Sequence, residues 1–261
     1  MVCHRMTDKP DNSAQKASPS YRIPALDQDF LLSEELRGLR FMLEYSKAEI
    51  ALKAREIKST IVVFGSARIR EDGPGRSAHW YKEARAFGRI ASERGGALGG
   101  APHTNVIATG GGPGVMEAAN RGARDADAPT IGFNIALPHE QEPNAYSTPD
   151  LTFSFHYFAM RKMHLAMRAA ALVVFPGGFG TLDELFEILT LTQTKKAPII
   201  PVVLFDEAYW RSVLNFDALL EHGMIKEDDL KLFKFAENAE AAWEALLQQG
   251  LAIASIAPKN V

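Results

Sequence analysis

A carboxylate and a guanidinium flank a glycine-rich segment that has the composition of an anion-binding turn. Arg161 lies in one predicted helix, and Glu184 follows Gly177–Thr181 in the first turn of the next. A glycine turn between a strand and a helix exposes backbone N–H groups, and the helix N-terminus adds about half a positive charge. Such a turn binds anions, most often phosphate. These residue types therefore favour a phosphate site with an acid–base side chain beside it.

A second glycine-rich segment, Gly110–Gly114, follows another predicted strand. It does not have the G-x-G-x-x-G spacing of the dinucleotide fingerprint, and the chain has no Gly-Lys-Ser/Thr of a P-loop. Each glycine turn alone is equally explained as a tight strand–helix connection. Two such turns in one sheet favour a phosphate or nucleotide site.

The charged residues also have structural explanations. Arg161 and Lys162 form a charge pair, which is usually a solvated helix face. Their apolar neighbours, among them Phe158 and Met163, instead favour a packed surface. Glu184 could simply complement the helix dipole or act with Asp183 at the helix cap. Its place beside a glycine turn makes a role as catalytic base the sharper hypothesis.

Other chemistries lack the residues that they need. The histidines are scattered and no H-E-x-x-H occurs, so we expect no metal site. No G-x-S-x-G elbow is present. The lone cysteine, Cys3, lies in a polar segment, so neither a disulfide framework nor a cysteine nucleophile is expected.

The elements that must position these groups alternate between short apolar runs and helical patterns. We predict strands at 60–64, 106–108, 130–134, 151–155, 171–175 and 199–205, and helices at 30–57, 77–93, 115–126, 209–220 and 239–248, besides helices on either side of the 171–175 strand. Pro201 inside the last strand suggests an edge or a bulge.

This alternation predicts an α/β fold, a Rossmann-like doubly wound and mainly parallel sheet with helices on both faces. Ligands bind at the carboxyl ends of such strands, near the switch point. The turns at Gly65-Ser66, Gly110–Gly114 and Gly177–Gly180 each follow a strand, so they should meet at one edge of the sheet. We expect a flexible tail at 1–25, one domain at 26–250 that includes the extra N-terminal helix, and a tail at 251–261.

Composition narrows the class of protein. The chain has 261 residues, of which 46% are hydrophobic and 23% charged, and a net charge of −3. This balance gives no electrostatic reason to expect a nucleic-acid or acidic-membrane partner. No apolar run approaches about 18 residues, which predicts no membrane span. The N-terminal residues lack the apolar core of a secretory signal, so we expect a cytoplasmic protein.

From about Thr60 to Phe205 the chain resembles the LOG ("lonely guy") family, whose members were long labelled lysine decarboxylases. Residues 176–184 read PGGFGTLDE and match the family's PGGxGTxxE motif. Met160-Arg161-Lys162 matches its R-K segment, and Thr109–Gly112 and Phe64–Ser66 match two weaker elements in the family's order.

The resemblance implies a Rossmann-like homodimer or higher homo-oligomer that needs no cofactor. Its members cleave the N-glycosidic bond of nucleoside 5′-monophosphates, either AMP or cytokinin riboside monophosphates, to free base and ribose 5-phosphate. Carried over by position, Arg161 and Glu184 would be catalytic. Gly178–Thr181 would hold phosphate with Lys162 and Thr190 beside them, and Glu140 would lie near the base or ribose. The implied substrate-binding set is Ser66, Gly110, Gly111, Gly112, Glu140, Met160, Lys162, Gly177, Gly178, Phe179, Gly180, Thr181, Leu182, Asp183 and Thr190.

The chain departs from the short family members in two ways. Glu117 stands where many of them have glycine, and the N-terminal helix and the C-terminal tail are additional; both features indicate the longer bacterial subgroup. Two other functions remain as alternatives. One is a nucleotide sensor on the same fold without hydrolysis. The other is a decarboxylase, which would need a lysine in a pyridoxal phosphate-anchoring context, and we find none.

Overall fold

The computed structural model describes residues 11–137 and 142–253. The chain divides into two compact units between Glu44 and Tyr45. In the first unit, short helices α1 (Ser13–Ala17) and α2 (Gln28–Leu31) are interspersed with 3-10 turns at Pro19–Tyr21, Pro24–Leu26 and Glu34–Leu36. The three elements before residue 27, where a tail is expected, bury no residue.

The predicted helix 30–57 begins later than its apolar spacing indicates. Helix α3 runs from Arg37 to Ala54. Ser33 has an extended backbone with φ −63° and ψ 154°, which interrupts the helical path between α2 and the turn that leads into α3. The second unit begins within α3, and there Ala48 and Leu52 are buried in its core.

The second unit is built on seven parallel strands in the order β4-β3-β2-β1-β5-β6-β7. Their bounds are β1 Thr60–Phe64, β2 Val106–Thr109, β3 Thr130–Ile135, β4 Thr152–Phe155, β5 Ala169–Val174, β6 Val202–Phe205 and β7 Lys234–Ala236. Every strand pair is parallel. The predicted α/β, doubly wound fold is confirmed.

The central strands β1 and β2 are buried at every position and mostly apolar, because both faces of the sheet are covered. In β1, Ile61 and Val63 lie in one core cluster, whereas Val62 and Phe64 lie in the other. Successive side chains of a strand point to opposite faces, so a strand between two helix layers is mostly apolar on both faces.

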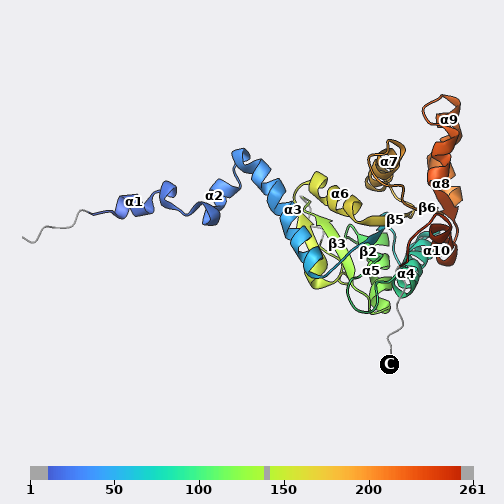
Figure 1. Ribbon diagram of the computed structural model, residues 1–261, viewed down its shortest axis with the longest axis horizontal. Helices are drawn as coiled ribbons and strands as arrows, with labels where there is room; N and C mark the ends of the chain where they lie inside the picture. The colour runs from blue at the N-terminus through green and yellow to red at the C-terminus, as the bar shows by residue number, and fades with distance from the viewer. Residues whose placement is uncertain (1–10, 138–141, 254–261) are drawn as a thin grey trace, which may run out of the picture. The chain divides into compact units, whose positions relative to one another are not determined.

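The helices form two layers, which can be followed in Figure 1. Residues of α4, α5 and α10 contribute to one core cluster, and residues of α3, α6, α7, α8 and α9 contribute to the other. The bounds are α4 Ser77–Arg94, α5 Val115–Asp125, α6 Phe158–Met167, α7 Phe179–Gln193, α8 Glu207–Val213, α9 Phe216–Glu221 and α10 Ala239–Gln248, with 3-10 turns at Pro149–Leu151 and Glu227–Leu232.

Three details differ from the sequence prediction. Pro201 precedes β6 and does not interrupt it, and β6 is no edge strand because β7 pairs with it. The three-residue β7 is too short to carry a periodic signal. The single helix expected at 209–220 is two helices, because Leu214 is extended and the Asn215 side chain caps α9 by accepting the Ala218 N–H at 3.0 Å.

The topological switch lies between β1 and β5, at the middle of the sheet. From β1 the chain builds β2, β3 and β4 outward on one side, then returns to pair β5 with the other side of β1. The loops after β1 and β5 therefore leave in different directions, and the crevice between them is where ligands bind in this class of fold.

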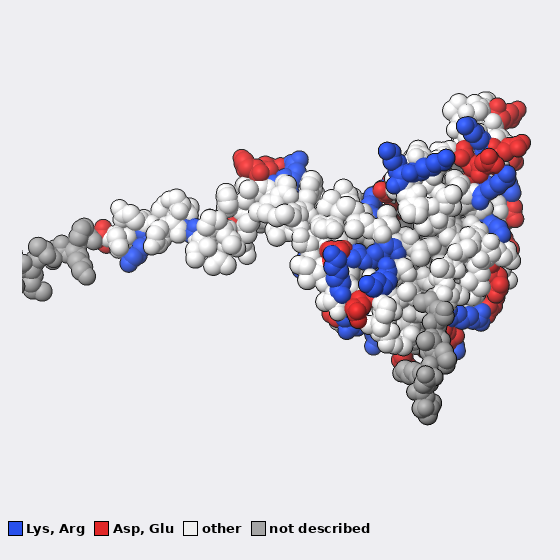
Figure 2. All heavy atoms as spheres, in the orientation of Figure 1, with Lys and Arg blue, Asp and Glu red and all other residues white. Residues whose placement is uncertain are grey.

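Charged side chains of both signs gather in groups on the displayed face, with uncharged surface between them (Figure 2). None of the helices in the described ranges is both long enough and apolar enough to cross a membrane.

Candidate functional site

A cleft with a volume of about 580 Å³ lies at the carboxyl ends of β1, β2 and β5. All three predicted glycine turns contribute to it, as expected for loops that follow neighbouring parallel strands. Its lining consists of Phe64, Gly65, Ser66, Ala67, Arg68, Gly110, Met116, Arg161, Gly177, Gly178, Phe179, Gly180, Thr181, Leu182, Tyr209 and Val213.

The turn after β5 presents unpaired backbone donors to this cleft. Helix α7 begins at Phe179, and the N–H groups of Gly178, Phe179 and Gly180 have no acceptor within the described residues. The N–H groups of Thr181 and Leu182 both donate to the Gly178 carbonyl, each at 3.0 Å. Free donors at the N-terminus of a fifteen-residue helix make an anion receptacle.

Arg161, which lines the cleft, contacts Glu184, which lies in a small pocket that shares Phe64 with the cleft. Arg161 Nη2, from α6, donates to Glu184 Oε1, from α7, at 3.1 Å. The two side chains are 13% and 4% exposed, so the pair is nearly enclosed. Arg161 Nε is also buried and has no acceptor within the described residues, while its guanidinium carbon lies 5.2 Å from the centre of the Phe158 ring. The pair thus combines a fixed cation with a carboxylate that is largely withdrawn from water.

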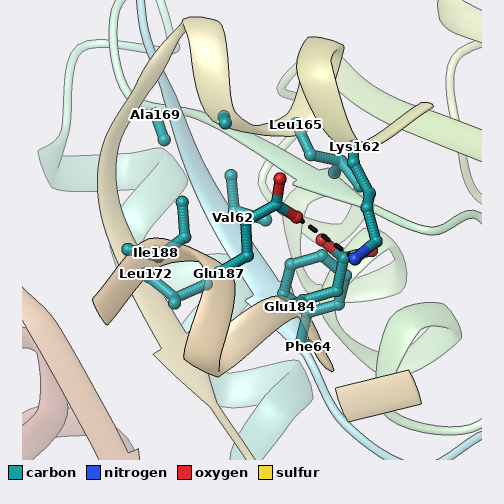
Figure 3. Close-up of a pocket in the computed structure, with 10 residues that line it drawn as sticks. Val62, Phe64, Lys162, Leu165, Ala169, Leu172, Glu184, Glu187 and Ile188 are labelled. Carbon is teal, nitrogen blue, oxygen red and sulfur yellow. Dashed lines mark ion pairs between the residues drawn. The ribbon is translucent and has the colours of Figure 1, made fainter. Parts of the chain in front are cut away.

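Burial raises the pKa of Glu184 to about 7, although Arg161 and Lys162 act to lower it and Glu187 and Asp183 add to the rise. Figure 3 shows the reason: the carboxylate lies in a small pocket whose other walls are mostly apolar. A carboxylate in such surroundings loses hydration that the nearby cations only partly replace. A pKa near neutrality is the property that acid–base catalysis requires of a carboxyl group. The apolar walls are Val62, Phe64, Leu165, Ala166, Ala169, Leu172 and Ile188.

Lys162 is engaged with two other carboxylates of α7. Its Nζ lies 2.6 Å from Asp183 Oδ2 and 3.2 Å from Glu187 Oε2 (Figure 3 draws the latter pair). These contacts and the Glu184 charge raise the pKa of Lys162, against a lowering by burial. Lys162 therefore ties α6 to α7 and keeps positive charge close to Glu184.

The second glycine turn is held by a partly buried network of asparagines. The Asn144 N–H donates to the Gly111 carbonyl at 2.8 Å, and its side-chain amide donates to the Gly112 carbonyl at 3.1 Å. Asn134 also donates to the Gly111 carbonyl, at 3.1 Å. Gly111 has φ +70°, and a Cβ there would lie 2.0 Å from Asn134 Oδ1, so only glycine fits.

The structure brings most of the predicted site residues together. Gly111 and Gly112 lie in the turn behind Gly110. Glu184 and Lys162 line the adjoining small pocket, and Lys162 also pairs with Asp183. Met160 is partly buried against the core and does not line the cleft. Glu140 lies outside the described residues. The predicted residues that line the cleft directly are Ser66, Gly110, Arg161, Gly177, Gly178, Phe179, Gly180, Thr181 and Leu182.

Thr190 is not brought to the cleft. It lies nine residues beyond Thr181 on α7, which at about 1.5 Å per residue places it roughly 14 Å along the helix axis. It lines a separate cavity with Phe186 and Gln193. The expectation that it lies beside the phosphate turn is not met, because the helix carries it away.

Seven lining residues were not predicted as site residues: Phe64, Gly65, Ala67, Arg68, Met116, Tyr209 and Val213. Tyr209 follows the carboxyl end of β6 closely, as Arg68 follows that of β1. The rule that ligands bind at strand ends was therefore a usable signal for both. In the described parts of the chain, no group of three or more His, Cys, Asp or Glu side chains is placed to hold a metal ion.

The chain is similar in sequence to proteins of one known family. A family model described as "possible lysine decarboxylase" matches residues 116–246. The probable cytokinin riboside 5′-monophosphate phosphoribohydrolase LOGL5 of Oryza sativa subsp. japonica is 26% identical over 169 residues, which cover 64% of this chain and 64% of the rice protein. The cytokinin riboside 5′-monophosphate phosphoribohydrolase LOG4 of Arabidopsis thaliana is 25% identical over 158 residues, 59% of this chain and 72% of that protein. The match thus spans less than two thirds of the rice protein.

Solved structures share the fold. The X-ray structure of TM1055 superposes with a TM-score of 0.52 at 21% identity and covers 73% of this chain and 99% of that one. The molybdenum cofactor binding protein of Rippkaea orientalis superposes with a TM-score of 0.51 at 23% identity, covering 74% and 97%. At these identities the likeness concerns the fold alone.

Proposed function

The chain belongs to the family described as possible lysine decarboxylase, which is the family of the LOG proteins, and from this premise we propose that it hydrolyses nucleoside 5′-monophosphates. The products would be a free base and ribose 5-phosphate. The observation that carries the proposal is the enclosed Arg161–Glu184 pair, 3.1 Å apart beside a glycine turn with free N–H groups.

In the proposed reaction the 5′-phosphate binds at the turn after β5. The N–H groups of Gly178, Phe179 and Gly180 supply donors, and the α7 N-terminus adds favourable charge. Binding energy from the phosphate, which does not itself react, holds the ribose in its reactive position.

Glu184 would then act on both the ribose and the attacking water. As the C1′–N bond breaks, its electron pair leaves with the base and positive charge develops on the ribose, which a nearby carboxylate stabilises. The water oxygen bonds to C1′ and gives a proton to Glu184, and the departing base takes up one proton from solvent. A carboxyl group with a pKa of about 7 can receive that proton and release it again near neutral pH. Arg161 keeps the carboxylate in place and orients phosphate and ribose.

The substrate class is a nucleoside 5′-monophosphate carrying adenine or a modified adenine. Chromatographic product analysis against a panel of nucleoside monophosphates, including AMP and a cytokinin riboside monophosphate, tests the proposal. We expect free base and ribose 5-phosphate in equal amounts. Binding of AMP without release of adenine would instead indicate a nucleotide-binding protein, and carbon dioxide release from lysine would indicate a decarboxylase.

The turn itself offers a further test. A Cβ on Gly177 would lie 2.1 Å from Thr181 Oγ1 and 2.6 Å from Thr181 Cβ, and the β-branched threonine cannot move aside easily. Gly177→Ala should therefore distort the turn and raise the dissociation constant for AMP by about tenfold or more. Gly180→Ala is the matched variant, because a Cβ there meets nothing within 4 Å. Isothermal titration calorimetry on both variants should show the smaller loss for Gly180→Ala; equal losses would contradict the steric explanation.

A further inference from the structure

Tyr209 makes a direct hydrogen bond to the turn after β5. It lies in α8, and its hydroxyl donates to the Gly177 carbonyl at 2.8 Å. Tyr209 lines the 580 Å³ cleft and also a second cavity of about 330 Å³, whose lining includes Trp80 and Gly177. It therefore lines both cavities, and it contacts the turn directly.

Tyr209 is itself held firmly. Asp206, which is 0% exposed, caps α8 by accepting the Tyr209 N–H at 3.0 Å. The same carboxylate accepts from Trp80 Nε1 at 2.8 Å and pairs with Arg76 Nη1 at 2.7 Å. The Trp80 and Tyr209 rings meet edge to face with centroids 5.8 Å apart. Asp206 adopts the left-handed backbone, with φ 73°, so this cap has a defined and unusual geometry.

The hydrogen bond to the Gly177 carbonyl fixes the orientation of the whole Gly177–Gly178 peptide group. The Gly177–Gly178 peptide is planar and trans, so its C=O and its N–H point in opposite directions. Holding the Gly177 oxygen towards Tyr209 therefore directs the Gly178 N–H the other way. That N–H is one of the donors without an acceptor. Both residues are glycines, whose backbone would otherwise rotate freely.

We propose that Tyr209 is a positioning residue: its hydroxyl holds the Gly177–Gly178 peptide in the orientation that presents the Gly178 N–H to the phosphate of the nucleotide. The inference rests on the proposed function for the identity of the ligand. Asp206, Trp80 and Arg76 act indirectly, because they keep Tyr209 in place.

Tyr209→Phe tests this proposal, because it removes the hydroxyl and keeps the ring contact with Trp80. We expect the dissociation constant for ribose 5-phosphate, measured by calorimetry, to rise about fivefold to tenfold, as for the loss of one hydrogen bond. The KM for AMP should rise by a similar factor with a much smaller change in kcat. Binding of adenosine, which lacks the phosphate, should stay unchanged.

Tyr81→Phe is the matched control. Tyr81 lies on α4 and its hydroxyl donates to Glu117 Oε1 at 2.7 Å, and neither residue lines the cleft. It should lower the melting temperature without changing phosphate affinity. If Tyr209→Phe also lowers only the melting temperature, the hydroxyl has a structural role alone and the inference is overturned.

The two proposals fail in different ways. A wild-type protein that binds ribose 5-phosphate through Tyr209 but releases no base from any nucleotide would end the proposed reaction and support the inference. A protein that releases adenine from AMP, with the same KM in wild type and Tyr209→Phe, would end the inference and leave the proposed reaction standing.

Discussion

Glu184→Gln should reduce adenine release from AMP by about 100-fold to 10,000-fold, the usual contribution of a positioned acid–base group. Glutamine preserves the shape of the side chain and an oxygen for Arg161, 3.1 Å away in the wild type, but it cannot take a proton from water or stabilise positive charge on the ribose. Steady-state kinetics of adenine release measure the loss, which should appear in kcat with little change in KM.

The neighbouring carboxylate on the same helix supplies the control for this variant. Glu187 lines the same small pocket as Glu184 and pairs with Lys162 at 3.2 Å. Glu187→Gln should change the rate by less than about tenfold, since it removes one partner of Lys162 and leaves the Arg161–Glu184 pair intact. Similar rates in Glu184→Gln and wild type would refute the mechanism.

Wild-type rate should also follow the ionisation of Glu184. The carboxylate is the active form, so kcat/KM should rise as the pH increases towards about 7. Above that pH the ionisation of Glu184 should cause no further increase.

The same carboxyl group should make the protein less stable as pH rises through the acid range, and Glu184→Gln should remove this dependence. Its pKa is raised from 4.5 to about 7 in the folded protein. Between these values the folded state holds a proton that the unfolded state has lost, so the free energy of unfolding falls with increasing pH. At about 1.4 kcal/mol per unit of pKa, the loss is on the order of 3 kcal/mol, complete above pH 7 and absent below about pH 4.5.

Urea unfolding of wild type and Glu184→Gln at pH 5 and pH 8 measures this effect. The difference in unfolding free energy, variant minus wild type, should be a few kcal/mol larger at pH 8 than at pH 5. Glu49→Gln is the control. Pairing with Arg168 holds the pKa of Glu49 down at about 2, so its stabilisation is present at both pH values and is lost only in stronger acid. Its substitution should cost the same at pH 5 and pH 8. A Glu184→Gln difference that did not change with pH would show that Glu184 is ionised throughout.

The sequence predicts those parts of the fold that leave a pattern in a short stretch of residues. Strands such as β1 are buried on both faces, so each one appears as an uninterrupted apolar run, and the turns behind them are marked by glycine. Short or capped elements escaped prediction. Strand β7 has three residues, and the break between α8 and α9 depends on the extended Leu214, whose residue type does not reveal it.

The candidate site likewise has a part that the sequence predicts and a part that it does not. Arg161 and Glu184 were predictable as neighbours because both flank one strand–turn–helix segment, so a short stretch of chain brings them together. Asn144 and Tyr209 contact the glycine turns through hydrogen bonds to backbone carbonyls, from segments remote in sequence. A carbonyl acceptor is present at every residue, so such contacts leave no pattern in the sequence. The raised pKa of Glu184 likewise depends on side chains from β1, α6 and β5 that only the folded chain assembles around it.

The pairing of β1 with β5 has a consequence for biosynthesis. Thr60 and Ala169 are register partners, although β2, β3 and β4 and their helices separate them along the chain. Until β5 has emerged from the ribosome, one side of β1 in the nascent polypeptide has no strand to pair with. Such an open apolar edge attracts other chains. Truncated products that end before β5 should therefore aggregate, and efficient production should depend on chaperone protection until the middle of the sheet is closed.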